Sequence, residues 1–328
     1  MRAMRQYLAT VLVVWTAACI AAYLYSKQQN IPASIAIAVL PAFLAELAFY
    51  IAPAFERLRK AFERIGSRPM RAALLVAGAI LPYLLLSLET HTFAWRPFGV
   101  LFLVTTIGAF WYSRKQRNII SDMLFLVVIA AVYLSRVFGQ IYLRPAPHVT
   151  VDVLGRLMWI RTGIMAVLSV RGWDAAGFGF LPSRPEWRIG IEYYFYFLPV
   201  GGVVAYLVKF AHFRPAPVVW WQFPVVMIAT FLGFLWVVAL FEEFFFRGFL
   251  QQLIARAAHN EAAGLLGASI VFGLAHLPFG SFPNWKFALL GGISGIFYGL
   301  AFEKARSVRA SMVTHALVVT TWRLLLTG

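Results

Sequence analysis

Residues 224–256 read PVVMIATFLGFLWVVALFEEFFFRGFLQQLIAR. The stretch exceeds the ~20 apolar residues that a helix needs to cross a bilayer, and no proline follows Pro224, so we expect one unbroken helix. Three charges, Glu242, Glu243 and Arg247, lie within its apolar part. Such charges cost at least ~2.5 kcal/mol each and are typical of functional sites in membrane helices. The alternative, a charge cluster at a helix end, is disfavoured by the apolar residues on both sides.

The whole chain shares this apolar character. Of its 328 residues, 61% are hydrophobic and 13% are charged, whereas soluble domains are about 25% charged. The mean hydropathy is +0.76. We therefore expect an all-α polytopic membrane protein with about ten transmembrane helices around a polar intramembrane cavity. The apolar runs that predict these helices are 7–25, 31–52, 72–88, 98–113, 119–135, 189–210, 218–257, 262–277, 286–303 and 310–326.

A polar region divides these runs into two blocks. We expect a five-span N-terminal membrane module at 1–135, a polar connecting region at 136–188 and a functional core at 189–328. Within the connecting region, the apolar segment 157–170 is interrupted by Arg161. This segment either crosses the membrane, which puts the basic loops on the cytoplasmic side, or lies at the surface, which inverts the second block.

The charge balance is strongly basic. The 29 Lys and Arg residues against 13 Asp and Glu residues give a net charge of +16. The excess lies in short loops between apolar runs, so we expect positive-inside topology, contact with anionic lipid and no nucleic-acid partner. The single cysteine, Cys19, excludes a disulfide framework. The basic clusters are Arg57, Arg59, Lys60, Arg64, Arg68 and Arg71, and Arg114, Lys115 and Arg117.

The charges of the 224–256 stretch divide by helical spacing. Glu243 and Arg247 are four residues apart, with the acid first, and therefore lie on one helix face in the favourable order. Glu242 points about 100° away and cannot share that partner well. The spacing predicts a Glu243–Arg247 ion pair beside a free carboxylate at Glu242.

The next apolar run carries a histidine, in Phe272-Gly273-Leu274-Ala275-His276. A lone intramembrane histidine is more often a packing residue than a catalyst. However, Glu242 and His276 lie about equally far on either side of the turn at 259–261, roughly 20–25 Å from it at 1.5 Å per residue. We therefore expect them at one depth, where a carboxylate and an imidazole can bind and deprotonate a water.

The last two apolar runs add a glycine ladder and a second histidine. Gly291, Gly295 and Gly299 are spaced for close helix packing. His315 follows the basic turn at 304–309 by only a short distance. Counting residues therefore places His315 shallower than His276, unless tilt or a deeply set turn brings the two together.

Three motifs combine these acidic, basic and histidine residues on successive runs. They are Glu242-Glu243-x-x-x-Arg247, Phe272-x-x-x-His276 and His315-x-x-x-Val319. In order, spacing and placement they resemble the CPBP family, the CAAX-protease and bacteriocin-processing (Abi) group of Rce1-like type II CAAX endopeptidases. The resemblance covers 189–328 and implies an intramembrane protease core whose cavity opens to the cytoplasmic side.

The resemblance also implies a role for each motif residue. Glu242 is similar to the general base, His276 to the residue that helps to hold the water, and His315 to an oxyanion donor. Glu243 and Arg247 are similar to the supporting ion pair of the site.

Two further motif positions are expected at the cavity, Phe272 and Val319. CAAX-processing members of the family have asparagine four residues after the last histidine, where this chain has Val319. The departure removes one oxyanion donor. It puts cleavage of prenylated CAAX sequences in doubt, but not peptidase activity as such.

We therefore expect a membrane-embedded endopeptidase of the bacterial cytoplasmic membrane that acts on a membrane-associated peptide or protein. The alternative is a non-catalytic membrane scaffold or immunity protein of the same fold. A transporter is disfavoured because the polar set is confined to one end of the chain. Glu242, His276 and His315 are just enough ligands for zinc, but no free carboxylate would then remain as base, so no cofactor is expected.

Overall fold

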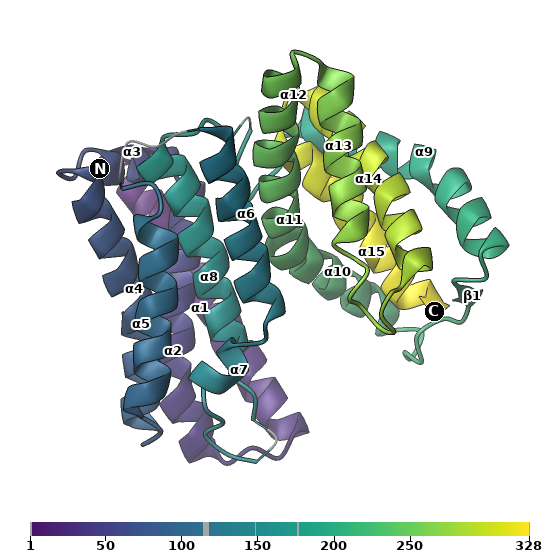
Figure 1. Ribbon diagram of the computed structural model, residues 1–328. Helices are drawn as coiled ribbons and strands as arrows, with labels where there is room; N and C mark the ends of the chain where they lie inside the picture. The colour runs from purple at the N-terminus through teal and green to yellow at the C-terminus, as the bar shows by residue number, and fades with distance from the viewer. Residues whose placement is uncertain (1, 114–117, 148, 176, 328) are drawn as a thin grey trace. The chain divides into compact units, whose positions relative to one another are not determined.

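The computed structural model describes residues 2–113, 118–147, 149–175 and 177–327. The basic cluster at Arg114, Lys115 and Arg117 lies outside the described residues. The fold is all-α apart from one pair of two-residue strands, and each of the ten predicted apolar runs overlaps a helix (Figure 1). The chain forms two compact units, Met1–Asp174 and Ala175–Gly328. The division at 135 and 188 stays a prediction.

The first unit is a bundle of long apolar helices. The central helix α8 (Val153–Met165) continues as π-helical turns to Arg171 and is almost entirely buried. The other elements are α1 (Arg2–Gln28), α2 (Ala33–Ile51), the single turn η1 (Ala52–Ala54), α3 (Glu56–Glu63), α4 (Arg68–Glu89), α5 (Trp95–Phe110), α6 (Ile119–Leu134) and α7 (Phe138–Ile141).

Two ion pairs account for the buried charged residues described in this unit. Arg161 of α8 donates from Nε and Nη2 to the two carboxylate oxygens of Glu46, 3.0 Å each. Arg171 donates in the same way to Asp122, with Nε 2.7 Å from Oδ1. Because Arg161 is paired, it does not prevent α8 from crossing a membrane. Val153–Arg171 is long and apolar enough to do so.

The second unit is built around the helix that contains the quoted stretch. This helix runs without a break from Phe223 to Ala258, but α-helical and wider π-helical segments alternate along it. It consists of α10 (Phe223–Gly233), the π-helical η3 (Phe234–Ala239), α11 (Leu240–Glu243), the π-helical η4 (Phe244–Gln251) and α12 (Gln252–Ala258). Wide π-helical turns commonly occur at functional sites.

Three further helices pack around this one. The antiparallel neighbour is α13 (Glu261–Leu274), and α14 (Trp285–Ala305) packs closely against α13. A Cβ at Gly273 would lie 2.5 Å from the Ala288 carbonyl oxygen, so only glycine permits this approach. α15 (Val308–Leu325) packs against α14.

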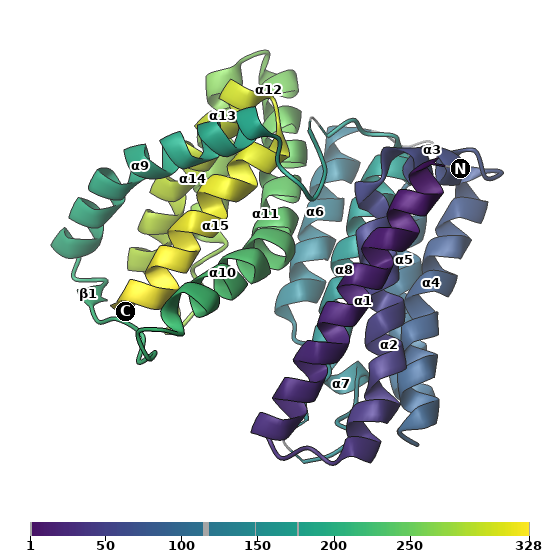
Figure 2. The same cartoon turned by 180° about the vertical axis from the view of Figure 1, so that it is seen from behind.

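The helix α9 (Arg184–Leu207) lies beside α15 and runs in the same direction (Figure 2). Thr314 of α15 donates a hydrogen bond to the Gly190 carbonyl oxygen of α9, 2.9 Å. At the start of both helices, Glu186 accepts from Ser307 and from Arg309. Burial raises the pKa of Glu186, but hydrogen bonds from Ser307 and Ser183, together with the charge of Arg309, outweigh it and bring the pKa below its ordinary value.

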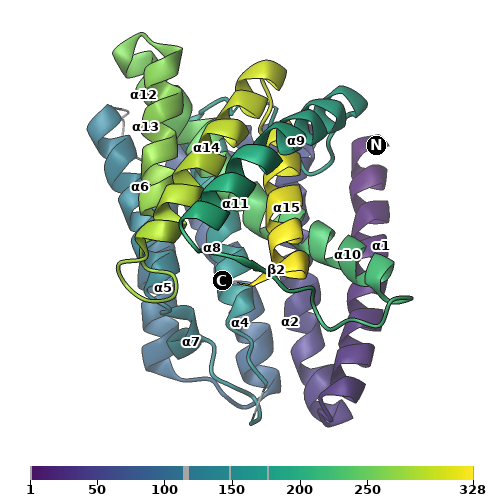
Figure 3. The same ribbon diagram turned by 90° about the vertical axis from the view of Figure 1, so that its right-hand side faces the viewer.

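At their other ends, α9 and α15 are joined by the strand pair. β1 (His212–Phe213) pairs antiparallel with β2 (Leu326–Thr327), so that Phe213 lies opposite Leu326. The two helices, which lie side by side in Figure 3, are therefore tied together at both ends. The candidate site residues of α15 lie between these ties in sequence.

Within the residues that the structure describes, six helices are long and apolar enough to cross a membrane, and three shorter helices are also apolar. The six are Met4–Gln28, Ala33–Ala54, Arg68–Glu89, Val153–Arg171, Phe223–Ala258 and Trp285–Ala305. The structure therefore has the all-α, polytopic character that the sequence predicts.

Candidate active site

The predicted ion pair at the centre of the second unit is present. Arg247 Nη1 donates to Glu243 Oε1 at 3.1 Å, and both side chains are fully buried. Arg247 also donates from Nη2 to the Gly295 carbonyl oxygen at 3.0 Å. Its guanidinium carbon lies 4.4 Å from the centroid of the Phe272 ring. The glycine ladder thus does more than pack helices, because it supplies an acceptor to the buried cation.

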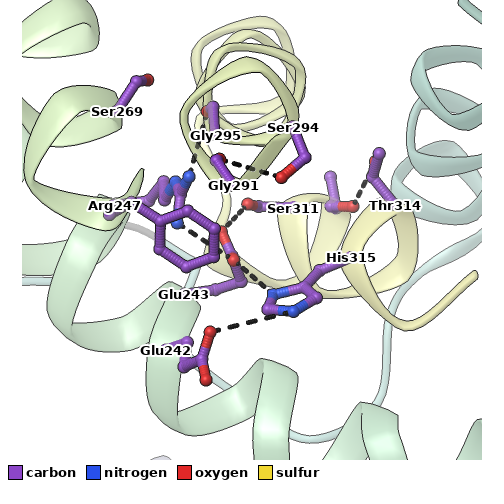
Figure 4. A network of polar contacts seen from close by, with 12 residues as sticks. Glu242, Glu243, Arg247, Ser269, Gly291, Ser294, Gly295, Ser311, Thr314 and His315 are labelled. Atoms are coloured by element: carbon purple, nitrogen blue, oxygen red, sulfur yellow. Dashed lines mark hydrogen bonds and ion pairs between the residues drawn. The ribbon is translucent and has the colours of Figure 1, made fainter. Parts of the chain in front are cut away.

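Glu243 binds more groups than the spacing predicted. Its Oε1 accepts from His315 Nδ1 at 2.7 Å as well as from Arg247, and its Oε2 accepts from the Ser311 hydroxyl (Figure 4). Ser311 and His315 are four residues apart and lie on one face of α15, toward Glu243. The four-residue spacing between Ser311 and His315 could have identified Ser311 from the sequence, but Ser311 was not among the predicted site residues.

His315 lies between the two adjacent carboxylates. Its Nδ1 contacts Glu243, and its Nε2 is 3.8 Å from Glu242 Oε2. The ring is stacked on Tyr298, with centroids 4.6 Å apart and an angle of 14° between the planes. Because the Glu243 carboxylate only accepts, the bond fixes a hydrogen on Nδ1 and directs Nε2 to Glu242.

The deeply set turn that the sequence left open accounts for the depth of His315. A Cβ at Gly248 would lie 2.9 Å from Val308 Cγ2, so α15 begins beside Gly248, well inside the end of its neighbour at Ala258. From that level, Glu242 and His315 are nearly equally far along their helices. The two residues therefore meet because α15 starts deep in the unit, a fact of tertiary packing.

Glu242 keeps hydrogen-bonding capacity. Its side chain is 22% exposed. Among the residues that the structure describes, its Oε2 is buried and has no hydrogen-bond partner. A buried acceptor without a partner is costly, so an incoming donor such as a water molecule gains from binding here.

The structure describes the surroundings of His276, and its predicted level with Glu242 stays a prediction. His276 follows the end of α13, and its Nδ1 lies 2.7 Å from the Phe272 carbonyl oxygen. Its ring packs against Phe287, with centroids 4.6 Å apart. Within the described part of the chain, no hydrogen bond or ion pair joins His276 to Glu242. Since Nδ1 faces a carbonyl, Nε2 is the nitrogen left to act.

A cavity connects the two histidines. It has a volume of about 180 Å³, and both His276 and His315 line it. Phe272 and Val319, the two positions expected at a cavity, line it as well. Tyr298 also contributes, and it lies seven residues after Gly291, on the same face of α14 as the ladder.

The donor set does not match a metal site. Among the described residues, no group of three or more His, Cys, Asp and Glu side chains is arranged to hold a metal ion. Glu243 has its oxygens occupied by Arg247, His315 and Ser311. Glu242, His315 Nε2 and His276 Nε2 remain, but these three side chains are not grouped as the three protein ligands of a catalytic zinc site would be.

Comparison with known proteins gives one match. Residues 221–321 match the family model described as type II CAAX prenyl endopeptidase Rce1-like. This match supports the resemblance that the three motifs indicated, and the matched segment contains all of them. Together with the apolar helices, it supports an integral membrane protein. No curated protein and no solved structure matches the chain.

Proposed function

We propose that this chain, whose residues 221–321 are similar to Rce1-like endopeptidases, is an intramembrane endopeptidase that cleaves a membrane-associated peptide with a water activated by Glu242. The observation that carries the proposal is the Glu242–His315–Glu243 arrangement. It combines a carboxylate that has an open acceptor with an imidazole held in one orientation.

In this mechanism Glu242 removes a proton from the water as it attacks the peptide carbonyl carbon. The same carboxyl group then gives the proton to the leaving amine. His315 Nε2 lies beside the reacting atoms, and a ring with hydrogens on both nitrogens donates one to Glu243 and the other to the oxyanion. His276, across the cavity, contributes Nε2 to holding the water or the substrate.

Glu243 has a positioning role in the proposal as well as a structural one. It fixes the orientation of His315 much as a carboxylate orients the histidine of a hydrolase triad. Arg247 and Ser311 hold Glu243 in place in turn. Loss of Arg247 therefore disturbs the active site through Glu243 and not only through stability.

The proposed mechanism uses no metal ion. Because the side chains present do not form a three-ligand site, no step is assigned to zinc.

The proposed substrate is a peptide or protein at the membrane of a bacterial cell, with anionic lipid at the basic loops. Val319, in the place of the family's asparagine, leaves His315 as the oxyanion donor of α15.

The proposal is tested with purified protein in lipid vesicles and a set of internally quenched peptides anchored by a lipidated cysteine. Glu242→Gln should keep the fold and lose cleavage, because the amide cannot accept a proton from water. The matched control is Glu261→Gln, an exposed acid on α13 that should leave turnover unchanged.

Wild-type turnover by Glu242→Gln would exclude Glu242 as the base. If a well-folded wild-type protein cleaved none of the peptides, the non-catalytic scaffold would become the better interpretation.

A further inference from the structure

One end of the second unit, called the basic end below, carries only positive charge. Figure 1 shows that β1, the C-terminus, the start of α10 and the loop between α13 and α14 lie at this end. The chain has no aspartate or glutamate at 193–241, 262–302 or 304–328, the segments that form it. Its exposed cations are Lys209, Arg214, Lys286 and Arg323.

Contacts between distant segments bring these cations together. The Lys286 ammonium donates to the Lys209 carbonyl oxygen at 3.4 Å, although the two residues are 77 positions apart. The Arg214 N–H donates to the Leu325 carbonyl oxygen at 3.0 Å. This bond places Arg214 beside the last turn of α15, which carries Arg323. The cluster is thus a product of the fold rather than of one basic loop.

The opposite end of the unit has mixed charge instead. It contains the turns that join α12 to α13 and α14 to α15. There Arg306 lies 3.5 Å from Glu261, and Arg309 donates to Glu186 at 2.8 Å. Within the described residues, no such ion pair involves a cation of the basic end. The basic end is therefore the one that can bind anions from outside the chain.

Exposed aromatic side chains lie where apolar helices begin or end at the basic end. Trp220 is 85% exposed and lies just before Phe223–Ala258, which is long enough to cross a membrane. Trp285 is the first residue of another such helix, and Tyr206 lies at the end of α9, and both are exposed. Tryptophan and tyrosine are enriched at the boundary between lipid and water. Three helix ends therefore mark the basic end as lying at this boundary.

We propose that the basic end lies at a membrane surface and binds the phosphate groups of anionic phospholipids with its four cations. A basic residue beside an apolar helix raises affinity for an anionic membrane about fivefold, and lysine and arginine both donate to phosphate oxygens. A nucleic acid or an acidic protein would need the same charge but not the aromatic residues. The proposal does not depend on peptidase activity.

The proposed contact is also separate from the one that the sequence predicted. That prediction concerned the basic clusters at 57–71 and 114–117, and none of the four cations of the basic end belongs to them.

The experiment uses the full-length protein in phosphatidylcholine nanodiscs, with Cys19→Ala and an uncharged fluorescent label at Gln222→Cys, an exposed position beside Trp221. A minor fraction of the lipid, either phosphatidylglycerol or phosphatidylcholine, carries a nitroxide quencher near its headgroup. The ratio of the two quenching constants should favour phosphatidylglycerol about fivefold or more. Lys209→Gln with Lys286→Gln should remove most of this preference, and Lys209→Arg with Lys286→Arg should keep it.

The matched control is Arg256→Gln with Lys304→Gln, which removes two exposed cations at the opposite end and should leave the ratio unchanged. Equal quenching by the two lipids in the labelled parent protein would overturn the proposal, as would the same loss of preference in both glutamine variants. No quenching by either lipid would show that the basic end lies away from the membrane.

Discussion

At the scale of single residues, Glu243 is the side chain on which the candidate site depends. It is fully buried and accepts from Arg247, His315 and Ser311, which belong to two different helices. When a buried carboxylate loses one of its hydrogen-bond donors, the free-energy cost of its desolvation remains, but part of the interaction that offsets this cost is lost. The site therefore tolerates changes at its edge better than changes at Glu243 or its partners.

Arg247→Ala tests this dependence. Removing one partner of a buried pair typically costs about 3–5 kcal/mol, so the detergent-solubilised variant should melt earlier and lose activity as His315 loses its support. Thermal melting and peptide cleavage measure the two effects. Arg256→Ala, on the same helix but exposed, is the control. Unchanged melting with lost activity would instead make Arg247 a group that acts on the substrate.

At the scale of elements, close helix contacts set the positions of the site residues. Gly248 admits the first residue of α15, which places His315 level with Glu242. Gly273 admits the backbone of α14, and it lies between Phe272 and His276 in sequence. A shift of a helix at either contact would move His315 or His276 away from the other site residues. A misplacement of about 1 Å is enough to impair catalysis strongly.

Gly273→Ala should push α13 and α14 apart, because the new Cβ would lie 2.5 Å from the Ala288 carbonyl oxygen. We expect a loss of about 1–3 kcal/mol in stability, as for other overpacked sites, together with reduced cleavage. Gly233→Ala is the control, since its Cβ meets nothing within 4 Å. Equal melting temperatures for both variants would show that the two helices separate at little cost.

At the scale of the whole molecule, buried charges are paired within each unit. The first unit holds Glu46 with Arg161 and Asp122 with Arg171, and the second holds Glu243 with Arg247. Pairing offsets part of the free-energy cost of placing these charges in an apolar environment. Glu242 differs from these acids, because it has no Arg or Lys ion pair within the described residues and lies 3.8 Å from Nε2 of the His315 ring. That difference supports the proposal that Glu242 is the general base.

The intact protein should work without a bound metal ion. Metal analysis of active, purified protein should find less than one zinc per chain, and a chelator should leave the cleavage rate unchanged. The expectation follows from the donor set, in which Glu243 is already occupied. Stoichiometric zinc whose removal and return abolish and restore activity would contradict it. Inhibition by the chelator without zinc in the protein would point to a metal bound by the substrate.

The sequence by itself determined the apolar helices and the local pairs, because both depend on short spacing along one chain. Apolar length predicted the helices, and the four-residue step predicted the Glu243–Arg247 pair. Only the tertiary structure decided which distant residues meet. Arg161 is 115 residues from Glu46 and His315 is 72 from Glu243, so no periodicity joins them. The depth of His315 and the position of His276 depend on where the neighbouring helices begin and on how closely glycine lets them pack. Both are properties of the packed helices and not of any single helix.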